Sequence, residues 1–116
     1  MKDNNTRTVV YYENYYFDFY SKLKPAVQKK FDWTISLIEQ FEKVPKKYFD
    51  HLTGSDGLWE IRVEYESNIY RVFTFFDKGK LIIAMNGFQK KSQKTPTKEI
   101  KLAEKLKKQY FDETEK

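Results

Sequence analysis

The fold is decided by the segments Leu58-Trp59-Glu60-Ile61-Arg62-Val63, Tyr70-Arg71-Val72-Phe73, Leu81-Ile82-Ile83-Ala84, Asn86-Gly87-Phe88-Gln89-Lys90-Lys91 and Lys94-Thr95-Pro96. The first three segments alternate apolar and polar residues or are wholly apolar, and turn-forming residues separate them, so they predict three strands. Each strand carries a cation or leads into one. Three adjacent strands would bring these cations onto one surface, which would suit a polyanion.

The rest of the chain predicts one further strand and three helices. Residues 6–13 are rich in β-branched and aromatic side chains and predict a first strand. A short helix begins after Asn14, and a longer one runs from Pro25 to about Lys43 with an apolar stripe at spacings of three and four. Thr95 and Pro96 are expected to be the cap and first residue of a last helix.

The resulting order, β-α-α-β-β-β-α, predicts an α+β fold. Its antiparallel sheet would pack with an N-terminal helical hairpin and a C-terminal helix, with helices mostly on one side. Residues 46–57 are expected to be a connection, and the strand at 81–88, apolar on both faces, to lie inside the sheet. The 116 residues suit a single domain over 1–116, with residues 1–5 and 112–116 expected to be flexible.

Composition excludes several classes of protein. Charged residues make up 34% of the chain, no apolar run approaches the roughly 20 residues of a membrane span, and the N-terminus lacks the apolar segment of a signal peptide. We therefore expect a cytoplasmic protein. Cysteine is absent and histidine occurs once, which argues against disulfides and against a Cys- or His-based metal site. No P-loop, dinucleotide fingerprint or nucleophile elbow is present, so no cofactor is expected.

The net charge of +5 is concentrated near the C-terminus. Residues 88–109 contain eight lysines and two glutamates. Such a block is typical of a solubilising helix face. It is equally typical of a surface that binds nucleic acid or an acidic protein, because it begins where a strand ends, close to Arg62 and Arg71.

Arg71 and Arg62 are the first candidate site residues. An arginine within a strand of large apolar residues costs free energy unless its guanidinium reaches water or an anion. Arg71 is therefore either ion-paired, with Glu60 or Glu64 as partner, or a preorganised donor for a phosphate. The same two interpretations apply to Arg62, which shares a strand face with both glutamates.

The segment after the last strand supplies the other candidates. Lys90, Lys91 and Lys94 are either a solvated loop or phosphate contacts. Phe88 would stack on a base if exposed, or belong to the core. His51 stands alone in a connection and is interpreted as a surface residue.

At this point the chain resembles the RelE/ParE superfamily of toxins from type II toxin–antitoxin systems, most closely the HigB-type, phage-derived gp49-like branch. The resemblance extends from about Val9 to Tyr110. Its residues are Leu23-Lys24-Pro25-Ala26-Val27, Leu52-Thr53-Gly54, Gly57-Leu58-Trp59-Glu60-Ile61-Arg62-Val63, Tyr70-Arg71-Val72, Asn86-Gly87-Phe88-Gln89-Lys90-Lys91, Lys94-Thr95-Pro96, Glu99-Ile100 and Ala103. Single motifs are weak, but their order and spacing together are specific.

The resemblance implies a microbial-RNase-like fold and a ribosome-dependent mRNA endonuclease that blocks translation. Because the sequence offers cations without a metal motif or a pair of histidines, we expect metal-independent attack of the RNA 2′-hydroxyl on the scissile phosphate. The implied partners are the ribosome, mRNA and a cognate antitoxin, usually a helix-turn-helix protein, in a hetero-oligomer. Mapped by motif, the implied catalytic residues are Arg62, Arg71, Lys90 and Lys91, and the implied RNA-binding residues are Phe88, Lys94 and Lys98.

The chain departs from the branch at one candidate acid or base. Relatives often carry histidine where this chain has Asn86, and many place histidine or tyrosine in the loop after the last strand, which here holds Phe88 and lysines. Two alternatives stay open: a ParE-like poison of DNA gyrase, and a non-catalytic antitoxin-binding module.

Overall fold

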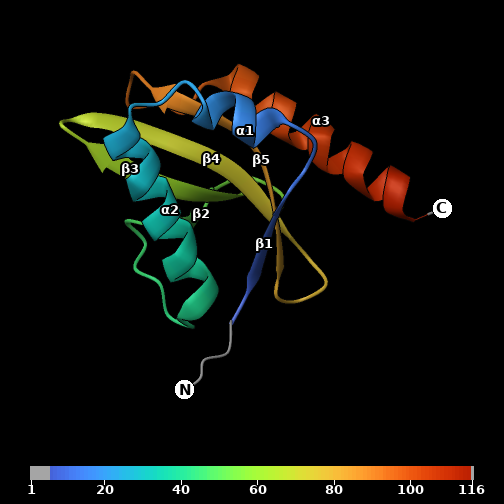
Figure 1. Ribbon diagram of the computed structural model, residues 1–116. Coiled ribbons are helices and arrows are strands. Elements are labelled where there is room, and N and C mark those ends of the chain that lie inside the picture. Colours follow the sequence, from blue (N-terminus) through green and yellow to red (C-terminus); the bar gives the residue numbers. More distant parts are fainter. Residues whose placement is uncertain (1–5, 116) are drawn as a thin grey trace.

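A five-stranded sheet forms the centre of the fold, with helices packed against both of its faces (Figure 1). The computed structural model describes residues 6–115, so the flexibility expected of residues 1–5 and 116 concerns residues outside the described chain. In chain order the elements are β1 (Thr8–Tyr11), α1 (Tyr15–Tyr20), α2 (Pro25–Gln40), β2 (Phe49–His51), β3 (Trp59–Tyr65), β4 (Asn68–Asp77), β5 (Leu81–Lys90) and α3 (Thr97–Thr114). The predicted α+β class is confirmed.

The strand order is β1-β5-β4-β3-β2, and β5 lies inside the sheet as its sequence predicts. Strands β2 to β5 pair antiparallel, but β1 runs parallel to β5, with Thr8 opposite Leu81. The expectation of a wholly antiparallel sheet is wrong at this pair. The chain leaves β1 through two helices rather than a tight turn, and nothing local in a strand's sequence records the direction of its neighbour.

Strand β2 is the element that the sequence analysis missed. It pairs with the beginning of β3, where His51 lies opposite Trp59 and Phe49 opposite Ile61. Phe49 is buried, and its ring stacks on that of Trp59 with centroids 5.1 Å apart. Three residues between turns show no period of their own, so this strand depends on pairing with β3.

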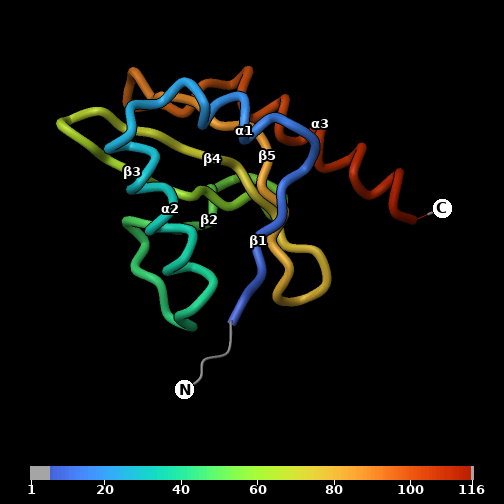
Figure 2. Tube along the Cα trace, in the orientation of Figure 1, coloured from blue at the N-terminus to red at the C-terminus, as the bar shows by residue number. Residues whose placement is uncertain are grey.

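The sheet buries apolar side chains on both faces. One face packs under α1 and α2, where Phe31 and Val72 belong to the same core cluster. The other face packs under α3, where Phe73, Phe75 and Leu106 belong to a second cluster. The expectation of helices mostly on one side is therefore wrong, because the alternating side chains of β4 and β5 are apolar in both directions. Figure 2 traces the backbone of the sheet and of the helices around it.

Helix α2 begins at Pro25, which suits a first turn because its missing N–H is not needed there. The helix ends at Gln40, earlier than expected, since Phe41 is extended. Arg7 holds this end: its guanidinium donates to the carbonyl oxygens of Ile38, Phe41 and Glu42 at 3.0, 2.7 and 2.8 Å. The N-terminal segment is thereby tied to the last turn of α2.

Helix α3 differs from the sequence-based expectation at both ends. The residue at its N-terminal boundary is Pro96, and no side chain caps the helix, so Thr95 is not its cap. The helix continues to Thr114, so fraying from Asp112 is not observed. Glu113 accepts a hydrogen bond of 2.9 Å from the Tyr12 hydroxyl, which ties the last turn to the segment after β1.

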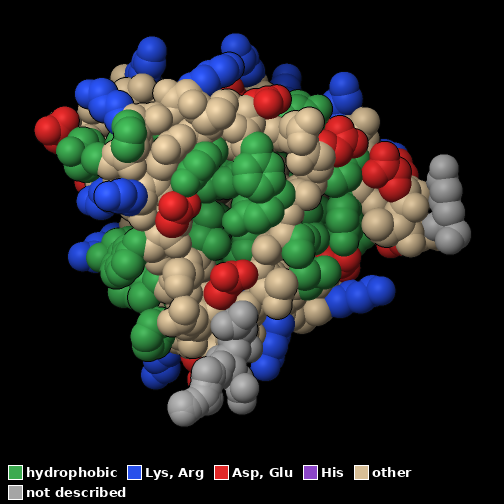
Figure 3. All heavy atoms as spheres, in the orientation of Figure 1, with side chains coloured by type: hydrophobic (Ala, Val, Ile, Leu, Met, Phe, Trp, Pro, Cys, Tyr) green, Lys and Arg blue, Asp and Glu red, His purple; other side chains and the backbone are tan. Residues whose placement is uncertain are grey.

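The face seen in Figure 3 shows hydrophobic side chains gathered between α2 and β1, with lysines and arginines mainly around the rim. Val10 and Phe17 are among the exposed apolar side chains of the protein. Among the described helices, none combines the length and apolarity needed to cross a membrane.

Candidate functional site

Arg62 and Arg71 lie directly opposite each other on β3 and β4, and Phe88 lies opposite Arg71 on β5. The three side chains therefore form a row across the sheet, on the face that also carries α3. The sequence-based expectation that neighbouring strands bring the two arginines together agrees with this register.

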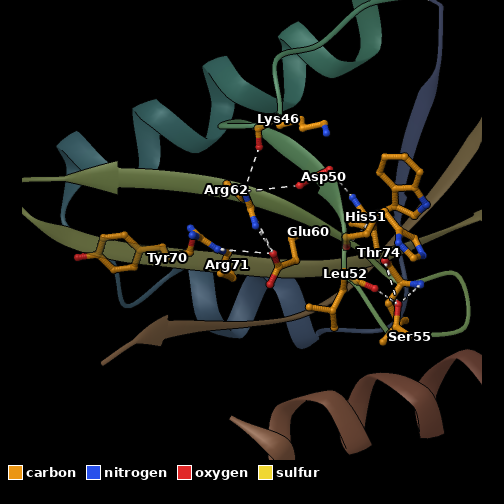
Figure 4. A network of polar contacts seen from close by, with 12 residues as sticks. Lys46, Asp50, His51, Leu52, Ser55, Glu60, Arg62, Tyr70, Arg71 and Thr74 are labelled. Carbon is orange, nitrogen blue, oxygen red and sulfur yellow. Dashed lines mark hydrogen bonds and ion pairs between the residues drawn. The ribbon is translucent and has the colours of Figure 1, made fainter. Parts of the chain in front are cut away.

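Glu60 is the residue that joins the two arginines (Figure 4). Its Oε1 accepts hydrogen bonds from Nε and Nη2 of Arg62 at 3.2 and 3.1 Å, and lies 3.8 Å from Nε of Arg71. Asp50 on β2 adds a second carboxylate, 3.8 Å from Nη1 of Arg62. The ion-paired interpretation of both arginines is thus the one seen in this geometry, with Glu60 as the shared partner.

The two arginines differ in their access to solvent. The side chain of Arg62 is 28% exposed and that of Arg71 8%, while that of Glu60 is 2% exposed. Nη1 of Arg62 also donates to the carbonyl oxygen of Lys46 at 3.2 Å, and Nη1 of Arg71 to that of Tyr70 at 3.1 Å. An incoming anion would therefore meet Arg62 first.

Burial and the neighbouring carboxylates affect the pKa of Arg71 in opposite directions. Desolvation lowers the pKa of Arg71, the neighbouring Arg62 lowers it further, and Glu60 and Glu64 oppose the change. An arginine nonetheless stays charged, because its intrinsic pKa exceeds about 12. In the described part of the chain, Oε2 of Glu60 and Nε of Arg71 are buried without a hydrogen-bond partner. Unsatisfied buried polar atoms of this kind are uncommon and are a reason to look for function.

Two guanidinium groups and two carboxylates cancel in charge, so the centre of the face is not the bare cationic surface that the sequence suggested. Positive charge is added beside it by the end of β5. Lys90 lies opposite Ile69, one alternate position beyond the row of Arg71 and Phe88. A hollow of about 450 Å³ opens there, lined by Ser67, Ile69, Lys90, Lys91, Ser92 and Gln93. Lys94 and Lys98 are exposed in the following segment and first turn of α3.

Phe88 belongs to the core. It is 7% exposed, and its ring lies 5.3 Å from that of Phe73 in the cluster beneath α3. This is the alternative that the sequence analysis left open beside stacking on a base. A ring buried in this way has no free face on which a base could stack.

Asn86 stands where relatives often carry a histidine, and His51 is the single histidine of the sequence. Asn86 is 4% exposed, and its amide donates to the carboxylate and carbonyl oxygens of Glu99 at 3.0 and 3.2 Å, which ties β5 to α3. The register shifts here, since Val72 pairs with Gly87 but Thr74 with Ala84. His51 is half-buried at the end of β2, edge-on to Trp59.

Sequence reasoning named Glu60 only as one of two possible partners of Arg71, and it did not name Asp50. One signal for Glu60 was available: it stands two residues before Arg62 on the same strand face, and two arginines on neighbouring strands require a counter-charge. No comparable signal marked Asp50, because its strand was itself not predicted.

Comparison with known families supports the resemblance stated from the motifs. Residues 18–108 match the family model described as phage derived protein Gp49-like (DUF891), a range that contains Asp50, Glu60, both arginines and the lysines after β5. No curated protein matches the chain. Because the matched range covers most of the chain, the protein belongs to the Gp49-like family of phage-derived proteins, within the RelE/HigB-like toxin group.

Proposed function

We propose that the protein is the toxin of a type II toxin–antitoxin system and that it cleaves mRNA on the ribosome. Family membership suggests a toxin–antitoxin toxin and implies an antitoxin partner. The observation that carries the nuclease proposal is the pair of guanidinium groups, Arg62 and Arg71, held side by side by Glu60 next to the lysines of β5.

RNA brings its own nucleophile, the 2′-hydroxyl, so the protein has to orient that group and stabilise charge on the phosphate. Arg62 receives the scissile phosphate, because it is the more exposed arginine. The phosphate then competes with the Glu60 carboxylate for the N–H groups of Arg71. The transition state carries more negative charge on the phosphate than the substrate does, so it competes better with Glu60 for Arg71. Arg71 therefore binds the transition state more tightly than the substrate, which is what lowers the barrier.

Once the phosphate has displaced it from Arg71, the Glu60 carboxylate can accept the proton of the 2′-hydroxyl. The 2′-oxygen attacks phosphorus at the same time. The bond from phosphorus to the 5′-oxygen breaks, and Lys90 or Lys91 protonates that leaving oxygen. The products are a 2′,3′-cyclic phosphate and a 5′-hydroxyl. Lys94 and Lys98 bind phosphates of ribosomal RNA.

The test is primer extension on an mRNA in a cell-free translation system. We expect wild-type protein to cut at in-frame codons only when ribosomes are present. Arg62→Ala and Arg71→Ala should lower the cutting rate by about 100- to 1000-fold, the usual effect of removing a charge-stabilising donor. Lys105→Ala is the matched control, since it removes an exposed cation of α3 that has no part in the proposed site. Wild-type cutting by a folded Arg71→Ala protein would refute the assignment.

The ion pairing of Arg71 favours one alternative, a non-catalytic binding module, because a nearly buried and compensated guanidinium also serves structure alone. The same assay separates the cases. Translation that stops without cuts indicates another translational target. Translation that continues indicates a gyrase poison or an inactive module.

A further inference from the structure

A second cationic surface lies on the far side of Arg62 from Glu60, between α2 and the outer edge of β3. It is a groove of about 550 Å³, and its walls include Lys29, Lys30, Trp33, Lys47, Tyr48 and Arg62. Glu64 is the acidic residue of its lining. Cations and aromatic rings therefore face one opening.

The groove exists because β2 covers only the first part of β3. Pairing with β2 involves Trp59–Ile61, and the backbone N–H of Arg62 still donates to Tyr48 at 2.8 Å. Beyond that point α2 lies beside the strand, and Lys30 donates to the carbonyl oxygen of Glu64 at 2.8 Å. These two hydrogen bonds join the walls of the groove to β3.

Trp33 is the unusual residue of the groove. It is 53% exposed, although tryptophan is among the side chains that gain most from burial. The edge of Tyr48 contacts it, with centroids 5.2 Å apart, and Lys47 lies 5.0 Å from the centre of the Tyr48 ring. Lys29 and Lys30 stand four and three residues before Trp33, hence on the same side of α2.

We propose that this groove binds a nucleotide of the RNA strand adjacent to the scissile phosphate. The base stacks on Trp33, and the flanking phosphates contact Lys47 and Lys30. Stacking rings inside a cationic groove are the usual device of proteins that bind single-stranded nucleic acid. The proposal rests on the nuclease function above.

Continuity with the arginine pair favours RNA over an acidic protein segment. Arg62 lines the groove and also belongs to the pair that receives the phosphate. A single strand that contacts Arg62 can therefore continue to Trp33. The carboxylates beside this path are those of Glu60 and Asp50, which pair with Arg62, and that of Glu64 in the lining. An acidic peptide would use the lysines but has no need of a bare indole face.

The chain offers a direct optical test, because it has two tryptophans, Trp33 and Trp59. In a Trp59→Phe protein, Trp33 is the sole indole. The probe is a short single-stranded RNA with 2′-O-methyl groups, which binds without being cut. We expect saturable quenching of Trp33 emission and an apparent Kd that rises with salt.

Two variants locate the site, with affinity followed by the anisotropy of a labelled RNA. Trp33→Ala should weaken binding by roughly 5- to 150-fold, the range for loss of one stacked base. Lys47→Glu should weaken it and reduce the salt dependence. The controls are Phe17→Ala, which removes another exposed ring, and Lys105→Glu, which reverses another exposed charge.

Each outcome of these measurements either supports or overturns the groove as an RNA site. Saturable quenching of Trp33, together with RNA affinity that falls in both groove variants and is kept in both controls, supports the groove. This holds even if the wild-type protein fails to cut mRNA, in which case only the nuclease function falls. RNA binding that is unchanged in the groove variants overturns the proposal. So does quenching by oligoglutamate but not by RNA, which would assign the groove to an acidic protein, or quenching by neither.

Discussion

Replacing Glu60 with glutamine is the perturbation that tests the arginine pair most directly. The amide keeps the shape of the side chain and removes its charge. Arg71, whose side chain is 8% exposed, then loses its carboxylate partner inside the fold. Arg62 is 28% exposed, so water replaces much of what it loses.

The expected cost follows from these exposures. Removing one member of a buried ion pair costs about 3–5 kcal/mol, because the remaining charge is left desolvated and uncompensated. The exposed side of the network adds about 0–1 kcal/mol. A domain of this size has a free energy of unfolding of about 5–15 kcal/mol, so Glu60→Gln should remove a large share of it. At about 4 °C per kcal/mol, the Tm falls by about 12–24 °C.

The assay is urea unfolding followed by tryptophan fluorescence and circular dichroism, for wild type and Glu60→Gln. Glu64→Gln is the matched control: it removes an exposed carboxylate on the same face of β3 and should change little. Adding Arg71→Met to Glu60→Gln should restore most of the loss, since an apolar side chain of similar volume replaces the orphaned charge. A Glu60→Gln protein as stable as Glu64→Gln would show that Arg71 does not depend on this carboxylate.

Two further predictions concern packing and pH. Gly87→Ala should destabilise the protein by about 1–3 kcal/mol, because the new methyl collides with the Phe19 ring, and in a double-mutant cycle Phe19→Leu should reduce that cost. Alkaline pH should also lower stability: burial first, then a hydrogen bond to Glu113, raises the pKa of Tyr12, and burial raises that of Tyr16, both above the ordinary 10.0. This contribution is complete below pH 10 and is lost as pH rises above it, since the unfolded chain ionises first. The Tm measured at pH 8, 10 and 11 should therefore fall steadily, and less steeply for Tyr12→Phe.

Local sequence patterns predict most of the helices and strands and their order along the chain. β3, β4 and β5 were predicted because alternation and turns are properties of neighbouring residues, and Pro25 marked the start of α2 for the same reason. The direction of β1, the existence of β2 and the side of the sheet that α3 covers depend on partners distant in the chain. No window of sequence contains those partners.

The same distinction holds for the candidate site: its arginines were predictable from local sequence, and their surroundings were not. Arg62 and Arg71 were recognisable because an arginine among apolar strand residues demands an explanation, and adjacent strands place such residues together. Their exposures were not predictable, because α3 and the cluster around Phe73 decide how much of the face stays open. Phe88 shows the limit of prediction from local sequence. An aromatic residue at this strand end would stack on a base if the face were open, and it fills the core because α3 covers the face.

The parallel pairing of β1 with β5 orders events during synthesis. Thr8 is among the first described residues to be made, yet its partner Leu81 follows after most of the chain, and α3 comes later still. Until β1 docks, β5 presents an open edge to other chains, and long-range pairings of this kind form late in folding. The face that carries Arg62, Arg71 and Phe88 is therefore completed only after β5 and α3 have been made. With the proposed nuclease function, this order would delay the cutting of mRNA until β5 and α3 of the newly made chain have folded.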